Sequence, residues 1–110
     1  MEINIQTIQS INVATLAGDI DSNTASTVTE QILPLIQPQG KIILDMEKVF
    51  YMSSAGLRML LSLYRQAAAQ EGKLVLVGLA EEIKDTMSVT GFLTFFQTFE
   101  TLQEGLIFLQ

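Results

Sequence analysis

Apolar and polar residues alternate along the first part of the chain, as at Ile3 and Ile5. An alternation with a period of two is typical of β-strands that bury one face. It runs through residues 2–9 and again through residues 11–17, and Gly18 then breaks it. The pattern therefore predicts two paired strands at the start of the chain.

The spacing becomes helical after Gly18, where apolar residues recur three or four positions apart between Ala25 and Ile36. This periodicity predicts a helix that continues to about Gln37. Pro34 lies inside the segment, where a proline removes a backbone donor and crowds the preceding turn. We therefore expect the first helix to kink or to end early.

Two short runs are apolar almost throughout, residues 41–46 and 73–78, and each is typical of a strand buried on both faces. Residues 47–53 are expected to form the loop after the first run. Between the two runs, an apolar stripe predicts a helix from Ser54 to about Glu71, which Gly72 ends. The stripe consists of Leu57, Leu60, Leu61, Tyr64 and Ala68.

The last third of the chain combines a short amphipathic helix, a strand and a final helix. Residues 80–90 carry two glutamates in their first turn, and Gly91 follows the predicted end of this helix. A strand of about four residues is expected near residues 95–99. Thr101 and Glu104 have the spacing of a capping box, which predicts the start of the final helix.

The predicted order of elements is β-β-α-β-α-β-α-β-α, which indicates an α/β fold. We expect a mixed, mostly parallel sheet of about five strands with about four helices and one antiparallel hairpin at the N-terminus. A chain of 110 residues is long enough to bury a core of its own. No repeat, linker or low-complexity tract divides it, so residues 1–110 are predicted to form a single domain.

Composition narrows the chemistry, because the chain contains neither cysteine nor histidine. Disulfides, thiolate metal sites and the commonest general base are thereby excluded. Twelve acidic residues against six basic residues give a net charge of -6, which repels nucleic acid and anionic lipid surfaces. We expect no cofactor, no metal ion and no nucleic-acid partner.

The chain has no run of about 18 apolar residues, so no membrane insertion is expected. Its first residues lack the basic flank and apolar stretch of a signal peptide, which makes the cytoplasm the expected compartment. A hydrophobic fraction of 48% is high for a charged surface. It indicates an apolar or neutral patch that another protein covers.

Two junctions between a strand and a helix carry the polar candidates, because functional groups in open α/β sheets gather at the carboxyl ends of strands. The first junction contains Asp19 and Asp21. Two carboxylates alone are a poor cation site, so helix capping by Asp21 is the favoured interpretation. The phenylalanines after Gly91 are either a docking patch or core, and their alternation favours core.

The second junction is residues 51–57, with the sequence Tyr-Met-Ser-Ser-Ala-Gly-Leu. Ser53 or Ser54 can cap the following helix, and that role alone explains a serine at this place. The first-turn amides and the positive end of the helix dipole also tolerate a phosphate, so a phosphoserine is the second interpretation. A serine hydrolase is disfavoured, because the Gly-x-Ser-x-Gly motif and the histidine base are both missing.

With these residues in view, the chain resembles the STAS-domain family and, within it, the stand-alone anti-sigma factor antagonists. The most specific part of the resemblance is residues 51–57, and residues 16–21 and 42–46 also fit. The resemblance covers essentially all 110 residues. Family members often have aspartate at the position of Ser53, where this chain has serine.

The resemblance implies a bacterial protein-binding switch without enzymatic activity. Ser54 is the implied phosphorylation site, modified by a partner that is both an anti-sigma factor and an ATP-dependent serine kinase. A PP2C-type phosphatase restores the serine, and the unphosphorylated protein binds the kinase and thereby frees a sigma factor. The partner-binding residues that we expect are Asp21, Ser22, Asn23, Thr24, Met52, Ser53, Ser54, Ala55, Gly56 and Leu57.

An alternative function uses the same surface without phosphorylation. In that case the chain is a STAS interaction subunit of a transporter assembly or of a larger stress-signalling complex. A third possibility, an independent enzyme acting on a small molecule, lacks the catalytic groups that it needs.

Overall fold

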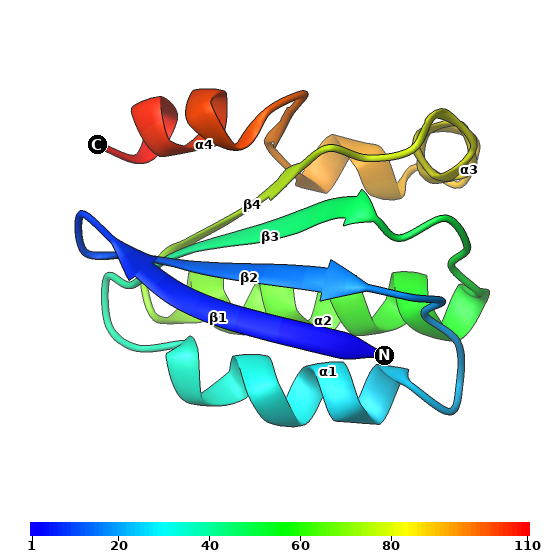
Figure 1. Cartoon of the computed structure of the whole chain (residues 1–110), viewed down its shortest axis with the longest axis horizontal. Coiled ribbons are helices and arrows are strands. Elements are labelled where there is room, and N and C mark those ends of the chain that lie inside the picture. Colours follow the sequence, from blue (N-terminus) through cyan, green and yellow to red (C-terminus); the bar gives the residue numbers. More distant parts are fainter.

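A computed structural model describes all 110 residues, and its centre is a five-stranded sheet in the order β1-β2-β3-β4-β5 (Figure 1). The strands are β1 (Glu2–Ile8), β2 (Ile11–Ala17), β3 (Lys41–Lys48), β4 (Lys73–Val77) and β5 (Thr98–Phe99). The helices are α1 (Ala25–Ile32), α2 (Ser54–Ala69), α3 (Glu81–Val89) and α4 (Leu102–Leu109). Two short 3-10 helices are η1 (Leu33–Leu35) and η2 (Phe92–Phe95).

The topology confirms the predicted fold class and the predicted order of elements. Strands β1 and β2 form the antiparallel hairpin, and β2, β3, β4 and β5 run parallel to one another. Each parallel strand is connected to the next by a helix, as the crossover rule for parallel strands requires. The loops after β2, β3 and β4 therefore meet at one end of the sheet.

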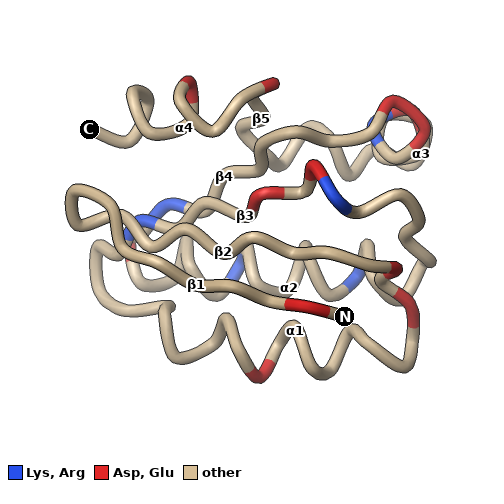
Figure 2. Tube along the Cα trace, in the orientation of Figure 1, with Lys and Arg blue, Asp and Glu red and all other residues tan.

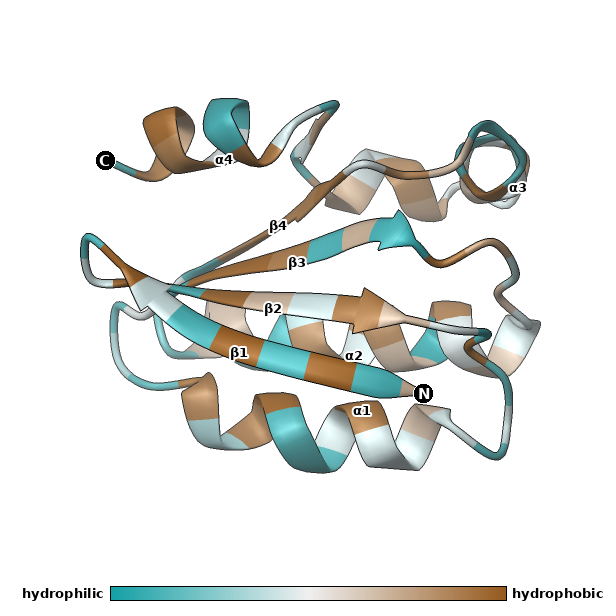
Figure 3. Cartoon of the chain, in the orientation of Figure 1, coloured by the Kyte–Doolittle hydropathy of each residue, from teal (hydrophilic) through white to brown (hydrophobic).

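Two apolar clusters lie on opposite faces of the sheet. The larger cluster joins α1, α2 and α3 to one face, with Leu44 and Leu60 fully buried within it. The smaller cluster packs α4 against Ile43 and Val75 on the other face. In Figure 3, β1 shows alternating hydrophilic and hydrophobic bands, whereas β4 is almost uniformly hydrophobic. These colours match one buried face for β1 and two for β4.

Of three element boundaries that bear on the sequence-based expectation, one agrees with it and two differ. Helix α1 ends early, at Ile32, and Pro34 lies in the short helix η1 that follows, in line with the expected effect of proline. Strand β3 extends to Lys48 because a register shift lets Lys48 pair with Ala17, so the predicted loop begins two residues later. The last strand is shorter than predicted, because residues 92–95 form η2 and only residues 98–99 pair with β4.

The phenylalanine-rich segment after Gly91 belongs mainly to the core. Phe96 is 8% exposed, and Phe92 is half-buried against the larger cluster. Phe95 is the exception in η2, with 44% of its surface exposed. The core interpretation is therefore right for most of this segment, and Phe95 remains available to solvent.

Candidate docking site at the start of helix α2

The loops after β2 and β3 are joined by a short parallel bridge between Ile20 and Met52. The Ile20 N–H donates to the Tyr51 carbonyl at 3.0 Å, and the Ser53 N–H donates to the Ile20 carbonyl at 2.8 Å. This bridge extends the β2–β3 pairing beyond the strand ends. It brings the two groups of expected partner-binding residues, 21–24 and 52–57, next to each other.

The side chain of Asp21 organises the turn before α1. Its Oδ1 accepts the Asn23 N–H at 2.8 Å and the Thr24 N–H at 3.1 Å. The Thr24 hydroxyl donates to the Asp19 carbonyl at 2.8 Å. Thr24 is the N-cap residue of α1, so the prediction that Asp21 caps this helix is wrong. Asp21 instead closes an Asx-type turn that ends one residue before the helix.

The carboxylates of this loop do not form a metal site. No group of three or more aspartates and glutamates in the chain is arranged to hold a metal ion. Asp21 already uses its Oδ1 to accept backbone amides, as a turn-closing carboxylate does. Asp21 therefore closes a turn and is not the N-cap that the sequence favoured.

Ser53 and Ser54 have different surroundings although they are neighbours. Ser53 has extended backbone dihedrals and is the N-cap of α2, and its Oγ accepts the Gly56 N–H at 3.3 Å. Ser54 is the first residue of α2, its side chain is exposed, and its hydroxyl forms no hydrogen bond within the chain. Capping is therefore assigned to Ser53, and the Ser54 hydroxyl stays accessible.

Gly56 allows the close approach of the two loops. A Cβ at this position would lie 2.6 Å from Met52 Cγ and 2.9 Å from Ile20 Cγ2. It would also lie 3.2 Å from the Ile20 carbonyl oxygen, which accepts the Ser53 N–H. Contacts this short are not tolerated without movement, so only glycine fits here.

The remaining predicted contact residues divide into exposed and buried positions. Ser22 and Asn23 are exposed, and Met52 and Ala55 are half-buried. Leu57 is only 5% exposed and packs in the larger core cluster. Leu57 thus anchors α2 beneath the site, whereas the exposed residues form its surface.

Two aromatic residues beside this surface were not among the expected contacts. Phe50 is 72% exposed and Tyr51 is 53% exposed, in the loop between β3 and α2. They border a hollow of about 140 Å³ that Met52 and Leu57 share with three residues of α3, namely Glu82, Ile83 and Thr86. The sequence signal was two adjacent aromatic residues in a predicted loop, where burial is not expected.

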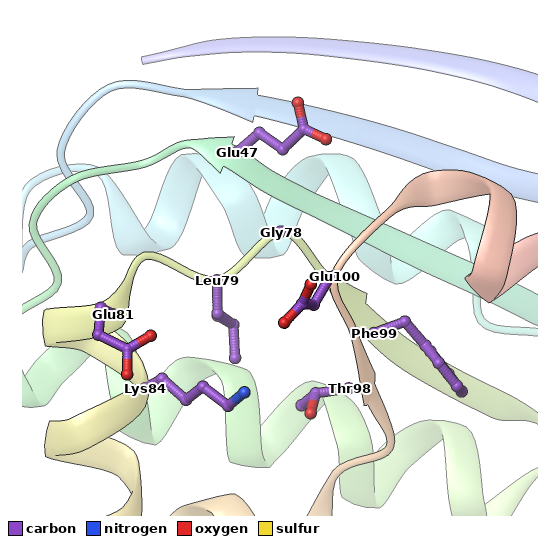
Figure 4. Close-up of a pocket in the computed structure, with 8 residues that line it drawn as sticks. All are labelled: Glu47, Gly78, Leu79, Glu81, Lys84, Thr98, Phe99 and Glu100. Carbon is purple, nitrogen blue, oxygen red and sulfur yellow. The ribbon is translucent and has the colours of Figure 1, made fainter.

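A second, polar hollow of about 340 Å³ lies at the ends of β3, β4 and β5 (Figure 4). Lys84 extends into it from α3, and Glu47, Glu81 and Glu100 contribute carboxylates. Gly78 lines its base with a positive φ of 71°. The polar groups of the lining are thus one lysine, three glutamates and the hydroxyl of Thr98.

Negative charge gathers around the loops at the site end of the sheet. Asp19 and Asp21 precede α1, and Glu81, Glu82 and Asp85 lie on α3. Figure 2 shows several of the acidic segments near these loops.

None of the helices combines the length and the apolar character that a bilayer span requires.

The comparison with known proteins identifies the family. The STAS domain model matches residues 2–105, so the chain belongs to the STAS domain family. The anti-sigma-B factor antagonist of Bacillus subtilis is 29% identical over 93 residues, which cover 83% of this chain and 85% of that protein. The resemblance on which the sequence analysis relied is confirmed.

Solved structures with the same fold include an anti-sigma factor antagonist and the cell fate determinant SpoIIAA. The crystal structure of an anti-sigma factor antagonist from Mycobacterium paratuberculosis has a TM-score of 0.87 at 20% identity, covering 98% of this chain and 92% of that one. The phosphorylated form of the Bacillus cell fate determinant SpoIIAA has a TM-score of 0.75 at 18% identity, covering 99% and 100%. At these identities the likeness concerns the fold.

Proposed function

We propose that this protein is an anti-sigma factor antagonist that acts by binding and not by catalysis. In its unphosphorylated form it binds an anti-sigma factor that is also a serine kinase, and phosphorylation of Ser54 ends the binding. The exposed, unbonded hydroxyl of Ser54 at the first turn of α2 is the observation that carries the proposal. The similarity to the Bacillus subtilis antagonist and to phosphorylated SpoIIAA supports it.

Ser53 caps α2 and Ser54 does not, and this difference supports a reversible modification at Ser54. The cap hydrogen bond uses the Oγ of Ser53, so a phosphoryl group on Ser54 does not remove it. The first-turn amides and the helix dipole favour negative charge at this position. The fold can therefore carry the phosphate without unfolding the start of α2.

The surface around Ser54 supports the proposal that a phosphate there weakens docking. Tyr51, Met52 and Ala55 present apolar atoms beside the hydroxyl, and a partner that covers them removes water from the whole patch. A phosphoryl group adds about -1.5 to -2 charge there. Burying that charge without a matched cation costs several kcal/mol, so the modified surface is disfavoured at an apolar interface.

The proposed cycle needs two further proteins in the cytoplasm. The first is the anti-sigma factor and serine kinase with an ATP-binding fold, which transfers the phosphate to Ser54. The second is a PP2C-type phosphatase that removes it. The Bacillus subtilis relative is covered over 85% of its length, which favours an antagonist over a STAS subunit of a transporter assembly.

Phosphate transfer tests the proposal directly. The wild-type protein, Ser54→Ala and the matched control Ser53→Ala are incubated with the cognate kinase and ATP, and intact-mass spectrometry counts the phosphates. We expect one phosphate on the wild type and on Ser53→Ala, and none on Ser54→Ala. Equal transfer to wild type and Ser54→Ala would overturn the assignment.

A further inference from the structure

Strand β4 is only partly paired on the side of β5. The two residues of β5 pair with Leu76 and Val77, and the Leu76 N–H donates to the Gln97 carbonyl at 3.1 Å. The Gly78 N–H donates to the Phe99 carbonyl at 2.9 Å. The first half of β4, residues 73–75, has no neighbouring strand on this side.

The backbone groups of Leu74 point to the unpaired side. Successive residues of a strand direct their N–H and C=O groups to opposite neighbours. The Lys73 N–H donates to the Gly40 carbonyl, on the side of β3, and the Leu76 N–H points to the side of β5. By this alternation the N–H and C=O of Leu74 face the side of β5 and have no strand partner there, although the residue as a whole is only 3% exposed.

An apolar hollow of about 240 Å³ lies beside this open edge. Its walls come from α2, β4, the segment around η2, and α4. Phe95 and Phe108 at its rim are 44% and 41% exposed. The lining residues are Tyr64, Ala68, Gly72, Lys73, Leu74, Val75, Phe95, Gln97 and Phe108.

The charge of this edge differs from that of the docking site at Ser54. Lys73 is the one charged residue that lines the hollow, and its Nζ lies 5.4 Å from the centre of the Phe108 ring. Lys41 is the register partner of Lys73 on β3 and adds a second positive charge. Glu71 precedes β4 and does not line the hollow.

We propose that an extended, acidic peptide segment of another protein binds here as an added strand. Its backbone pairs with the free N–H and C=O of Leu74, as in strand addition to an open sheet edge. One bulky apolar side chain enters the hollow between Tyr64 and Phe108, and a carboxylate contacts Lys73. This surface is separate from Ser54 and goes beyond the proposed function.

The probe for the test is the capped peptide acetyl-Glu-Leu-Thr-Phe-Glu-amide, titrated into the unphosphorylated wild-type protein labelled with nitrogen-15. We expect the amide resonances of Lys73, Leu74 and Val75 to shift and the Leu74 amide to exchange more slowly. A matched peptide with lysine in place of both glutamates should bind about threefold to fivefold more weakly, the effect of one or two exposed ion pairs.

Charge reversal at the edge supplies the matched variants. Lys73→Glu should weaken the acidic peptide and favour the basic one, whereas Lys48→Glu, at the opposite end of the sheet, should change neither. The proposal is overturned if millimolar acidic peptide leaves Leu74 unshifted, or if both peptides bind equally. Protection of Leu74 by concentration-dependent dimerisation without peptide would also overturn it, in favour of a second copy. Neither kinase nor phosphate takes part, so the outcome is independent of Ser54.

Discussion

Replacing Gly56 by alanine tests whether the bridge between the two loops depends on a missing side chain. The added Cβ would lie 2.6 Å from Met52 Cγ, in the middle of that side chain, and 2.9 Å from the Ile20 Cγ2 methyl, which the β-branched side chain holds close to the backbone. The Ile20 carbonyl, 3.2 Å away, is fixed by its hydrogen bond to the Ser53 N–H. The new methyl group must therefore push the loop of Met52 away from the loop of Ile20.

Two opposing contributions determine how much Gly56→Ala changes the free energy of unfolding. Overfilling a packed site costs about 1–3 kcal/mol, whereas alanine gains up to about 1 kcal/mol over glycine from helix propensity. The gain is smaller at Gly56, because this residue lies in the first turn of α2. We expect Gly56→Ala to lower the free energy of unfolding by about 1–2 kcal/mol, with a fall in the melting midpoint of about 4–8 °C for each kcal/mol.

Urea unfolding of a double-mutant cycle measures this effect and assigns its cause. Met52→Ala removes the atom closest to the new methyl group, so Gly56→Ala should cost less in the Met52→Ala background than in the wild type. Gly105→Ala is the control variant for binding experiments. Its Cβ would meet Val77 Cγ1 at 2.8 Å, so this substitution also overfills the fold, but in the core and away from the docking site. The packing argument would be refuted if Gly56→Ala were as stable as the wild type. It would also be refuted if the effects of Gly56→Ala and Met52→Ala on the free energy of unfolding were simply additive.

Three further changes separate stability from binding. Ser53→Ala should lower the free energy of unfolding by about 0.5–1 kcal/mol through loss of the α2 cap, measured by urea unfolding, and Ser54→Ala should leave it unchanged. Asp21→Ala should cost about 1–2 kcal/mol by the same measurement, and Asp21→Asn should retain most of the stability because the amide oxygen still accepts the turn N–H groups. Phe50→Ala should weaken binding to the kinase by at least about tenfold in calorimetric titration without lowering the melting temperature, because the ring is exposed; unchanged affinity would exclude Phe50 from the interface.

The sequence predicted the fold well because each element has a strong local pattern. The apolar runs of β3 and β4 and the stripe of α2 leave little choice between strand and helix. The prediction was least accurate for the segment near Phe95, because its five apolar residues within eight positions fit either a strand or a turn. Tertiary packing of Phe96 into the core decided for a 3-10 helix and a two-residue strand.

The sequence indicated where the candidate site lies, but neither how it assembles nor that Phe50 and Tyr51 are exposed beside it. The Ser-Ser-Ala-Gly sequence pointed to the start of α2, yet both serines were possible caps until the backbone of Ser53 proved extended. The bridge between Ile20 and Met52 joins residues 32 positions apart in a 110-residue chain, and no periodicity encodes such a contact. The exposure of Phe50 likewise depends on how α3 packs, which sequence patterns do not specify.

The most direct measurement compares the unmodified protein with protein that carries phosphoserine incorporated at position 54 during synthesis. Calorimetric titration with the anti-sigma factor kinase then reads the effect of the charge without any transfer step. We predict tight binding of the unmodified protein and a loss of about 100-fold or more in affinity with phosphoserine 54, because the interface would have to bury a doubly charged group beside apolar side chains. Equal affinity of the two forms would contradict the account.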